Sequence, residues 1–390
     1  MVESIFGDDA KHTDATIGRY SESTYPFLCR VKGAYWDQCR DLVDSWLASY
    51  PEPQRKALTA RLRSGDDEQF ASAFWELYLY DAFRRGGWRI EIEPQLLNRT
   101  TRPDFLVAMG DVSYYVEARC VFARRDKSEI ARLWKVLDAI NCIDSGRLSL
   151  VVVVKCVGSQ PPSIRKLRNK LDAWLTKVGR AGDADIPSGT RAESELEWDD
   201  GDWQLSFQAI FTNMPSAQQS IMSCGMAKGS CHDGAARLKK ALEGKGSKYG
   251  VLPHPLVIAI NMGEGFLADK DATDALYGSM AIREEFNELG PELSWVRMSD
   301  GYWRCPRGPA HSHVAGVLLA SGLTYYSVAR CVPTFWVNPS ADYAVDPLRL
   351  CRVARVVEGQ VQFVEPEIQP HDYFNLREDW PTGRPFPLVL

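Results

Sequence analysis

Hydrophobic and polar residues along the first half of the chain follow a pattern that predicts a helix and then three strands. From Asp66 onward, apolar residues recur at helical spacing behind an aspartate that can cap a helix, and Gly86-Gly87 end it. The next segments alternate between apolar and polar residues, as half-buried strands do. The predicted strands are residues 89–96, 103–109 and 113–119, and the last two form a hairpin with its turn at Gly110-Asp111.

The pattern beyond the hairpin predicts a helix over residues 128–140 and a strand at 147–156. The near-continuous apolar run of that strand is typical of a strand buried on both faces. A further helix opens at Pro161-Pro162-Ser163. Residues 66–180 are therefore expected to form an α/β (α+β) core, in which helices flank a mixed sheet.

Three segments surround this predicted core. Residues 1–65 carry apolar residues at helical spacing and predict a helical N-terminal segment. Residues 181–203 hold eight acids against one arginine without an apolar period, which predicts an acidic surface loop. Residues 204–390 contain further predicted strands and helices, and we expect them to form an α/β C-terminal extension packed on the core.

Composition and charge narrow the class of protein. The net charge of −5 disfavours a protein that coats nucleic acid non-specifically, although a local basic surface remains compatible with it. No apolar run approaches the roughly 20 residues of a membrane span, and the first residues do not resemble a secretory signal. We therefore expect a cytoplasmic protein that does not contact a membrane.

The ten cysteines show no regular spacing, which favours free thiols. Two groups could supply partial zinc ligands, but neither contains the paired cysteines of a structural zinc site. The groups are Cys224, Cys231 and His232, and Cys305, His311 and His313.

Charged residues gather on the predicted hairpin. Asp104 heads its first strand and Glu117 lies near the end of the second, with Gly110-Asp111 midway between them, so the two acids should lie opposite each other. Arg119 should point to the same side as Glu117, because residues two apart on a strand share a face. Two carboxylates on neighbouring strands can hold one Mg²⁺ or Mn²⁺, a metal suited to phosphodiester chemistry. A plain cross-strand ion pair is the structural alternative.

Together with Glu76 in the preceding helix, these residues resemble the PD-(D/E)xK, or restriction-endonuclease-like, superfamily. The resemblance rests on a helix glutamate, a Pro-Asp pair that opens a strand, an acid-x-cation run on the next strand and the element order, and it covers about residues 66–156. It implies an αβββαβ core, a metal bound by Asp104 and Glu117, and Glu76 as the helix acid of the site.

One position departs from the family pattern. Arg119 stands where the family carries lysine, and a guanidinium stays protonated, so Arg119 cannot act as a general base. It could still contact a phosphate or stabilise developing charge. Lys155, at the end of the next predicted strand, is a candidate for a displaced lysine.

Basic residues cluster after the motif and could contact the phosphates of a nucleic acid, with DNA favoured over RNA. They could equally be the solvated faces of two helices. The residues are Arg124, Arg125, Arg165, Lys166, Arg168 and Lys170.

The sequence leaves three functions open. The first is a nuclease-like phosphodiesterase that depends on Mg²⁺ or Mn²⁺. The second is a catalytically inactive module of the same fold that binds nucleic acid or a protein. The third is an α/β protein in which the acid pair is incidental. A homodimer is compatible with all three.

Overall fold

The computed structural model divides the chain into two compact units, which are described separately. Unit 1 comprises Met1–Asp9, Ala34–Ala123 and His232–Gly383, and unit 2 comprises Ala10–Gly33, Arg124–Cys231 and Arg384–Leu390. The structure describes residues 4–7, 12–97, 99–122, 126–181, 186–212, 221–226, 234–244, 248–249, 251–263, 267–287 and 290–386. The longest part of unit 2, Arg124–Cys231, therefore lies in the sequence between two parts of unit 1.

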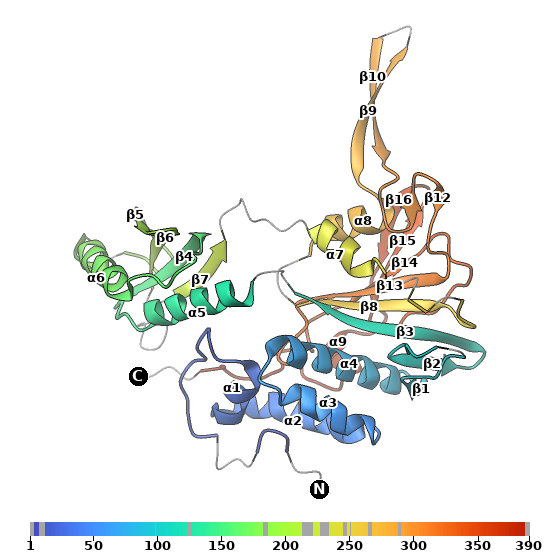
Figure 1. Cartoon of the computed structure of the whole chain (residues 1–390), viewed down its shortest axis with the longest axis horizontal. Helices are drawn as coiled ribbons and strands as arrows, with labels where there is room; N and C mark the ends of the chain where they lie inside the picture. The colour runs from blue at the N-terminus through green and yellow to red at the C-terminus, as the bar shows by residue number, and fades with distance from the viewer. Residues whose placement is uncertain are drawn as a thin grey trace. The chain divides into compact units, whose positions relative to one another are not determined.

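The first part of unit 1 is a helical layer followed by a meander of three strands (Figure 1). Asp66 caps α4 by accepting hydrogen bonds from the backbone N–H groups of Glu68 and Gln69. The elements are α2 (Ala34–Ser49), α3 (Gln54–Leu62), α4 (Asp67–Arg85), β1 (Arg89–Ile92), β2 (Phe105–Met109) and β3 (Val112–Val121).

The second part of unit 1 begins with a helix and a strand and continues to the C-terminal region. Its elements are α7 (Gly234–Leu242), β8 (Leu256–Met262), α8 (Asp269–Tyr277), β9 (Met280–Asn287), β10 (Gly290–Arg297), β11 (Arg304–Cys305), β12 (Gly308–Pro309), β13 (Val314–Ser321), β14 (Thr334–Val337), β15 (Arg352–Val357), β16 (Gln360–Val364) and α9 (Pro370–Tyr373).

Eight of these strands form one mixed sheet in the order β1-β2-β3-β8-β13-β14-β15-β16. β2 and β3 pair antiparallel around the turn at Gly110, which has a φ of 57°. β8 pairs parallel with both β3 and β13, and every residue of β8 is buried. β8 is therefore a central strand of this mixed sheet that is buried on both faces.

Helices cover both faces of this sheet (Figure 1). On one face lies α4, where the Trp75 indole N–H donates to the Ala259 carbonyl at 3.1 Å, and Trp46 of α2 stacks on Phe74 from the outer side. On the other face, α7 and α8 contribute buried residues such as Leu238 and Leu276 to a single apolar cluster with β8 and β13. α4 is thus sandwiched between the sheet and the outer helices, which explains why most of its residues are apolar.

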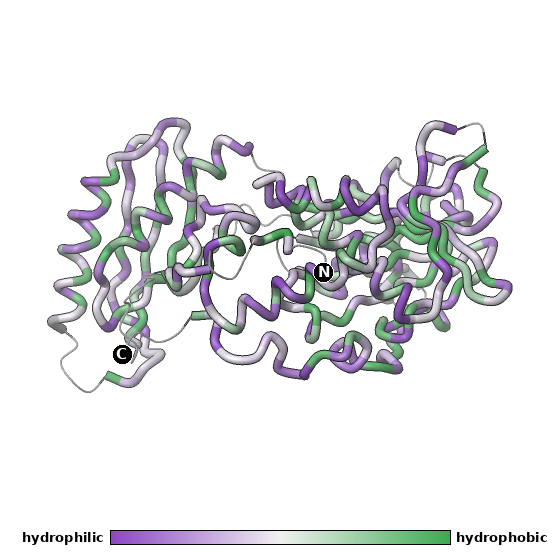
Figure 2. The backbone as a smooth tube through the Cα atoms, turned by 90° about the horizontal axis from the view of Figure 1, so that it is seen from below, coloured by the Kyte–Doolittle hydropathy of each residue, from purple (hydrophilic) through white to green (hydrophobic). Residues whose placement is uncertain are grey.

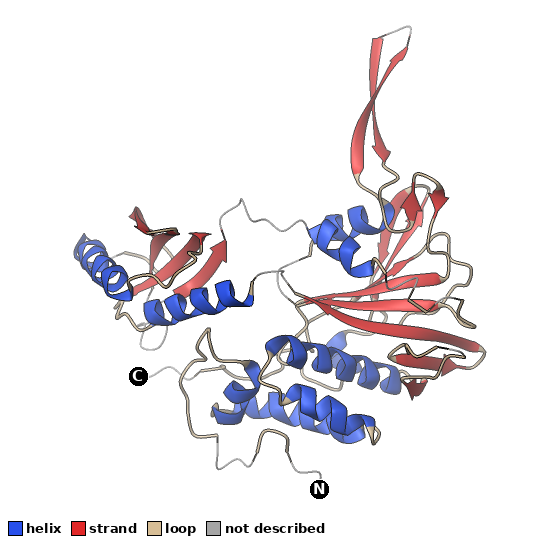
Figure 3. Ribbon diagram, in the orientation of Figure 1, coloured by secondary structure: helices blue, strands red, loops and turns tan. Residues whose placement is uncertain are grey.

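Unit 2 is a smaller sheet with two helices packed on it (Figure 3). Its strand order is β5-β6-β4-β7. α5 and α6 bury their apolar faces against one side of β4, and in α6 hydrophobic and hydrophilic residues alternate along the tube (Figure 2). The elements are α1 (Thr24–Arg30), α5 (Lys127–Asn141), β4 (Leu148–Cys156), α6 (Ile164–Ala181), β5 (Arg191–Asp200), β6 (Trp203–Phe211) and β7 (Ile221–Met226).

The predicted mixed α/β fold is confirmed, whereas the division of the chain differs from the expected one. The expected core at 66–180 is split, because β4 joins the sheet of unit 2 instead of pairing with β3. β4 buries only alternate residues, since both helices lie on one of its faces. The expected extension at 204–390 is also split: β6 and β7 belong to unit 2, while β8 and β13 are central strands of unit 1.

The segment expected to be an acidic loop at 181–203 contains the strand β5. Trp198 is buried and Leu196 packs against the core of unit 2, while Glu195 and Glu197 on either side of Leu196 are exposed. The acids therefore occupy the solvent face of an edge strand. The helical N-terminal segment at 1–65 is divided as well, with α1 in unit 2 and α2 and α3 in unit 1.

Among the residues that the structure describes, no helix is both long and apolar enough to cross a membrane.

Candidate acidic site where β2 begins

The candidate site lies where β3 extends beyond its neighbour β2. The register pairs Phe105 with Val116, so Asp104 and Glu117 are the next pair along the two strands, as expected from the turn. Asp104 accepts a hydrogen bond from the backbone N–H of Ala118 at 2.6 Å, and its own carbonyl accepts one from the N–H of Glu93 at 2.8 Å. The Asp104 side chain is thus fixed against the part of β3 that β2 leaves unpaired.

Glu117 is almost completely buried, with an exposed side-chain fraction of 3%, and two side chains hold its carboxylate. Lys248 donates from Nζ to Oε1 at 3.2 Å, and the hydroxyl of Tyr249 donates to Oε2. Lys248 also lies 2.9 Å from the Tyr249 hydroxyl. Because a buried carboxylate is costly without a partner, this pair of contacts stabilises the charge of Glu117.

Tyr249 connects the two acids electrostatically. Burial raises the pKa of Tyr249, and the hydrogen bond to Glu117 and the negative charges of Glu117 and Asp104 raise it further. The Tyr249 hydroxyl also lies 3.1 Å from the carbonyl oxygen of Arg102, just before Asp104. Tyr249 is therefore a neutral hydrogen-bond donor that positions Glu117 beside the strand carrying Asp104.

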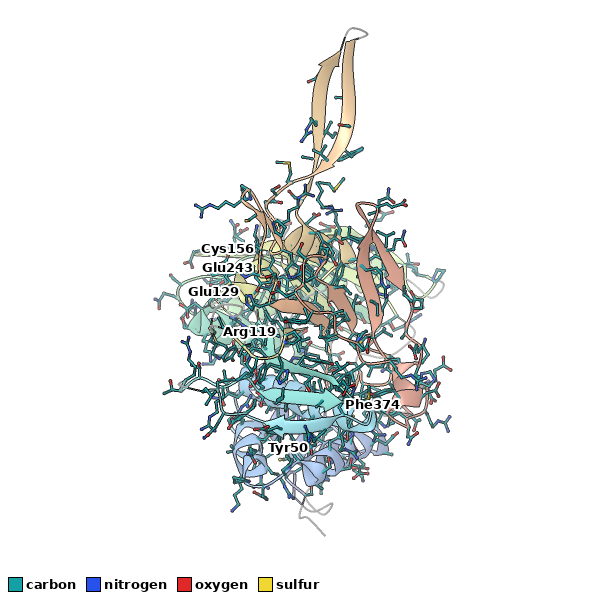
Figure 4. All side chains as sticks on the ribbon, turned by 90° about the vertical axis from the view of Figure 1, so that its right-hand side faces the viewer. Tyr50, Arg119, Glu129, Cys156, Glu243 and Phe374 are labelled. Atoms are coloured by element: carbon teal, nitrogen blue, oxygen red, sulfur yellow. The ribbon has the colours of Figure 1, made fainter. Side chains whose placement is uncertain are left out.

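Arg119 shares the β3 face of Glu117, as predicted, but its guanidinium is engaged with a helix. Nη1 donates to the carbonyl of Ala241 in the last turn of α7 at 2.7 Å. Figure 4 labels Arg119 on β3 and Tyr50 in the helical layer. A cation at the C-terminal end of a helix binds an otherwise unsatisfied carbonyl and interacts favourably with the helix dipole. Arg119 thus anchors the helix that precedes Lys248 and Tyr249.

Glu76 lies on the other side of the sheet. It belongs to α4, which covers the face of β3 where Cys120 contacts the Ala71 carbonyl. Arg61 of α3 grips both oxygens of Glu76, at 2.7 and 2.8 Å. Such a bidentate pair is strong and directional. Glu76 therefore pairs with Arg61 and is not placed to bind one metal ion together with Glu117.

The charges of Glu76 and Asp104 nevertheless act on common neighbours. Burial raises the pKa of Tyr50, and the charges of Glu76, Asp104 and Glu93 raise it further. Burial lowers the pKa of Arg61, but the hydrogen bond to Glu76 and the charges of Glu76 and Asp104 outweigh it, so the pKa is raised. Asp104 is thus within electrostatic range of residues on both sides of the sheet.

The structure offers no group of three or more acid, cysteine or histidine ligands within its described residues. Asp104 and Glu117 are the two hard oxygen donors that it brings together, and Mg²⁺ commonly binds to one or two carboxylates with water completing its shell. The donor set therefore fits one divalent cation, provided that Lys248 yields its place on Glu117.

The remaining predicted site residues belong to unit 2. Lys155 is paired with Glu197 at 2.7 Å, in a different sheet from Asp104. Lys166 lies 3.8 Å from Asp200, Arg168 donates to the Ala139 carbonyl, and Lys170 donates to the Glu197 carbonyl. Arg165 is exposed on α6. Arg124 and Arg125 lie outside the described residues.

Sequence reasoning did not identify Arg61, Lys248 and Tyr249 as site residues. Lys248 and Tyr249 occur in the run Gly-Ser-Lys-Tyr-Gly, which has too few glycines at the right spacing for a phosphate-binding loop. The feature that could have pointed to Lys248 and Tyr249 is their position in the chain, between α7 and β8, the strand that pairs with β3.

Comparison with known proteins adds no family. No protein-family model matches the chain, and searches of the curated proteins and of the solved structures give no match.

Proposed function

We propose that the chain is a divalent-metal-dependent nucleic-acid phosphodiesterase with a restriction-endonuclease-like core. The core would consist of α4, β1, β2, β3, α7 and β8, an αβββαβ order in which β8 pairs parallel with β3. Residues 124–231, the main part of unit 2, would then be an insertion between the third strand and the second helix of this core. The sequence predicts that α5 and β4 complete this core, whereas in this arrangement α7 and β8 complete it.

The proposal rests mainly on the position of Lys248. Its ammonium lies 3.2 Å from the carboxylate of Glu117, and the pairing of β2 with β3 places Asp104 opposite Glu117. In the family that the sequence resembles, a lysine accompanies the two acids. Lys248 supplies that lysine from the segment before β8, because Arg119 is engaged with α7 and Lys155 with Glu197. An ammonium can also lose its proton when its surroundings change, which a guanidinium cannot.

Asp104 and Glu117 would hold Mg²⁺ or Mn²⁺. When bound, the metal supplies a polarised phosphate and an activated water. The residues of the chain position these groups: Tyr249 orients Glu117, and the Ala118 N–H orients Asp104. Lys248, released from Glu117, would lie close enough to neutralise an oxygen of the phosphate.

A second candidate is a catalytically inactive module of the same fold that binds nucleic acid or a protein. It is favoured by the partners of the acids, since Glu117 and Glu76 each accept hydrogen bonds on both carboxylate oxygens. Under this alternative, Lys248 would replace the metal permanently instead of yielding to it. In this second candidate the exposed Arg165 and Lys166 of α6 in unit 2 would contact phosphates, with DNA as the favoured nucleic acid.

A cleavage assay separates the two candidates. We expect the purified chain to cut single- or double-stranded DNA, or RNA, with Mg²⁺ or Mn²⁺ and not with EDTA. Asp104→Asn and Lys248→Met should each lower the rate at least about a hundredfold, because they remove a metal ligand and a transition-state cation. Arg119→Lys should keep activity, since lysine can still reach a helix carbonyl.

Glu91→Gln and Lys270→Met serve as matched controls, because both side chains are exposed on other elements of unit 1. Their rates should equal that of the wild type. A wild type that binds nucleic acid but cuts no substrate with either metal would leave the inactive module as the function.

A further inference from the structure

The strands β9 and β10 form a ribbon that stands apart from the sheet of unit 1. They pair only with each other among the described strands, and the ribbon extends away from β11–β16 (Figures 1 and 3). A two-stranded hairpin without a third strand or a helix against it is only marginally stable in water. We therefore expect the ribbon to pack against another surface.

The register places the large apolar side chains of the ribbon on one face. Ile282 lies opposite Trp295, and residues directly opposite on paired strands point to the same side. Met280 and Leu293 fall on that side by the two-residue alternation. The exposed fractions are 57% for Ile282, 66% for Leu293 and 69% for Trp295. The other face carries smaller or polar residues such as Arg283 and Ser294.

The same apolar face carries one charge of each sign at its two ends. Arg297 lies opposite Met280 at the base, and Glu284 lies opposite Leu293 in the outer half of the ribbon. If two ribbons pack face to face with their strands antiparallel, the base of one lies against the outer part of the other. Arg297 of each copy then meets Glu284 of its partner, as a two-fold axis requires.

We propose that a second copy of this chain docks on this face, forming a two-fold dimer through the ribbons. Ile282, Leu293 and Trp295 would form its apolar centre, and two Arg297–Glu284 pairs would flank it. Arg297 donates one N–H to the Gly278 carbonyl at 2.6 Å, and its guanidinium carries four further N–H donors that can serve the partner. The complementarity lies within one face, which favours the same chain over an unrelated protein.

Nucleic acid is a poorer occupant. Residues 280–297 contain Glu284, Glu285, Glu288 and Glu292 against Arg283 and Arg297, so the ribbon has a net charge of −2. A strand with this charge repels phosphates. One face of a two-stranded ribbon offers less surface than the roughly 1,600 Å² that a standard interface buries. The dimer should therefore be weak and depend on protein concentration.

Sedimentation velocity of the full chain over a range of concentrations tests the proposal. The wild type should show a reversible monomer–dimer equilibrium, and Trp295→Glu should be monomeric. Arg297→Glu and Glu284→Arg should each raise the dimer dissociation constant about tenfold or more, because like charges then face each other. The double variant, with both charges exchanged, should return the dissociation constant to near the wild-type value.

Ser294→Glu is the matched control, since it places a new charge on the opposite face of the same strand, and it should leave the dimer unchanged. The rescue by the double variant excludes simple misfolding of the ribbon. A wild type that stays monomeric at every concentration overturns the proposal, and so does a double variant that remains as weak as the single ones. The proposal is also overturned if Trp295→Glu leaves the association state unchanged and instead weakens binding to nucleic acid.

Discussion

Glu117 illustrates how a buried carboxylate is kept charged at the residue scale. Lys248 and Tyr249, which both bind its carboxylate, are neighbours in sequence, so one short segment after α7 supplies both contacts. Lys248 is about one third exposed, while Glu117 is buried. Removing one partner of this pair should therefore cost more than it does in a surface ion pair and less than it does in a fully buried one.

Lys248→Met should lower the free energy of unfolding by about 1–2 kcal/mol, because it leaves Glu117 with the Tyr249 hydroxyl as its remaining partner of the two. In the background of Glu117→Gln the same substitution should cost clearly less, since no charge remains to be paired. Urea unfolding of the four proteins measures this coupling. The control Lys270→Met should change stability by less than about 0.5 kcal/mol, because the Lys270 side chain is 79% exposed. Equal costs in both backgrounds would show that Lys248 and Glu117 do not interact.

His311 provides a pH-dependent contribution to stability. Burial lowers its pKa from 6.5, and the neighbouring His313 lowers it further. Its ring stacks on Tyr302 with centroids 4.1 Å apart. Because the unfolded chain binds the proton more tightly, the neutral His311 contributes stability above its unfolded pKa that is lost as the pH falls through its folded pKa.

We therefore expect the stability of the wild type to fall more steeply between about pH 7 and pH 5 than that of His311→Asn. Asparagine suits this position, because the φ of 55° lies in the left-handed region that asparagine tolerates. Chemical unfolding at several pH values measures the two slopes. Parallel curves for the two proteins would mean that protonation of His311 is not coupled to folding.

Some of the site could be predicted from single residues, and some could not. Asp104 opposite Glu117 followed from the position of the turn, because a tight hairpin fixes the register of its strands. Lys248 and Arg61 could not be found in this way. They reach the acids through long-range packing of α7 and α3, which leaves no local pattern in the sequence.

At the scale of elements, the apolar runs that form β4 and β8 can both be recognised in the sequence, but the strands with which they pair cannot. Leu148–Cys156 and Leu256–Met262 are apolar runs of similar composition, and proximity to the hairpin in the sequence favours the first as the next strand of the sheet. Strand pairing depends on packing against helices and neighbouring strands, which the run itself does not encode. The strand that pairs with β3 is β8, and the helix that precedes it in the sequence is α7.

For the acidic strand β5, the alternation of a strand is present in the sequence, but the many acidic residues of the segment favour a loop. Its inward positions include Ala192, Leu196 and Trp198, at the two-residue period of a strand. The glutamates between them make the segment strongly negative, which favours the interpretation as a loop. Alternation is the better guide, because an edge strand needs apolar residues on one face only.

At the scale of the whole molecule, the chain folds into two units with separate apolar cores. Leu256 lies in the core of unit 1 and Leu150 in that of unit 2, and both are fully buried in strands. An insertion of this kind cannot be recognised from periodicity, since each segment looks like a normal part of an α/β protein. Only the pairing of distant strands reveals it.

We expect calorimetry to show two unfolding transitions, one for each unit. Leu150→Ala and Leu256→Ala each create a cavity worth about 2–5 kcal/mol, and each should lower the midpoint of one transition. The transition that moves should differ between the two variants. A single transition shifted by both substitutions would show that the two cores unfold as one.

The most direct test of the proposed metal-dependent activity is the anomalous scattering of crystals soaked in Mn²⁺. The proposal predicts one peak between the carboxylates of Asp104 and Glu117, with the Lys248 ammonium moved off Glu117 Oε1. A saturating soak that leaves no peak there, with Lys248 still bonded to Glu117, would contradict the metal site and leave the inactive module.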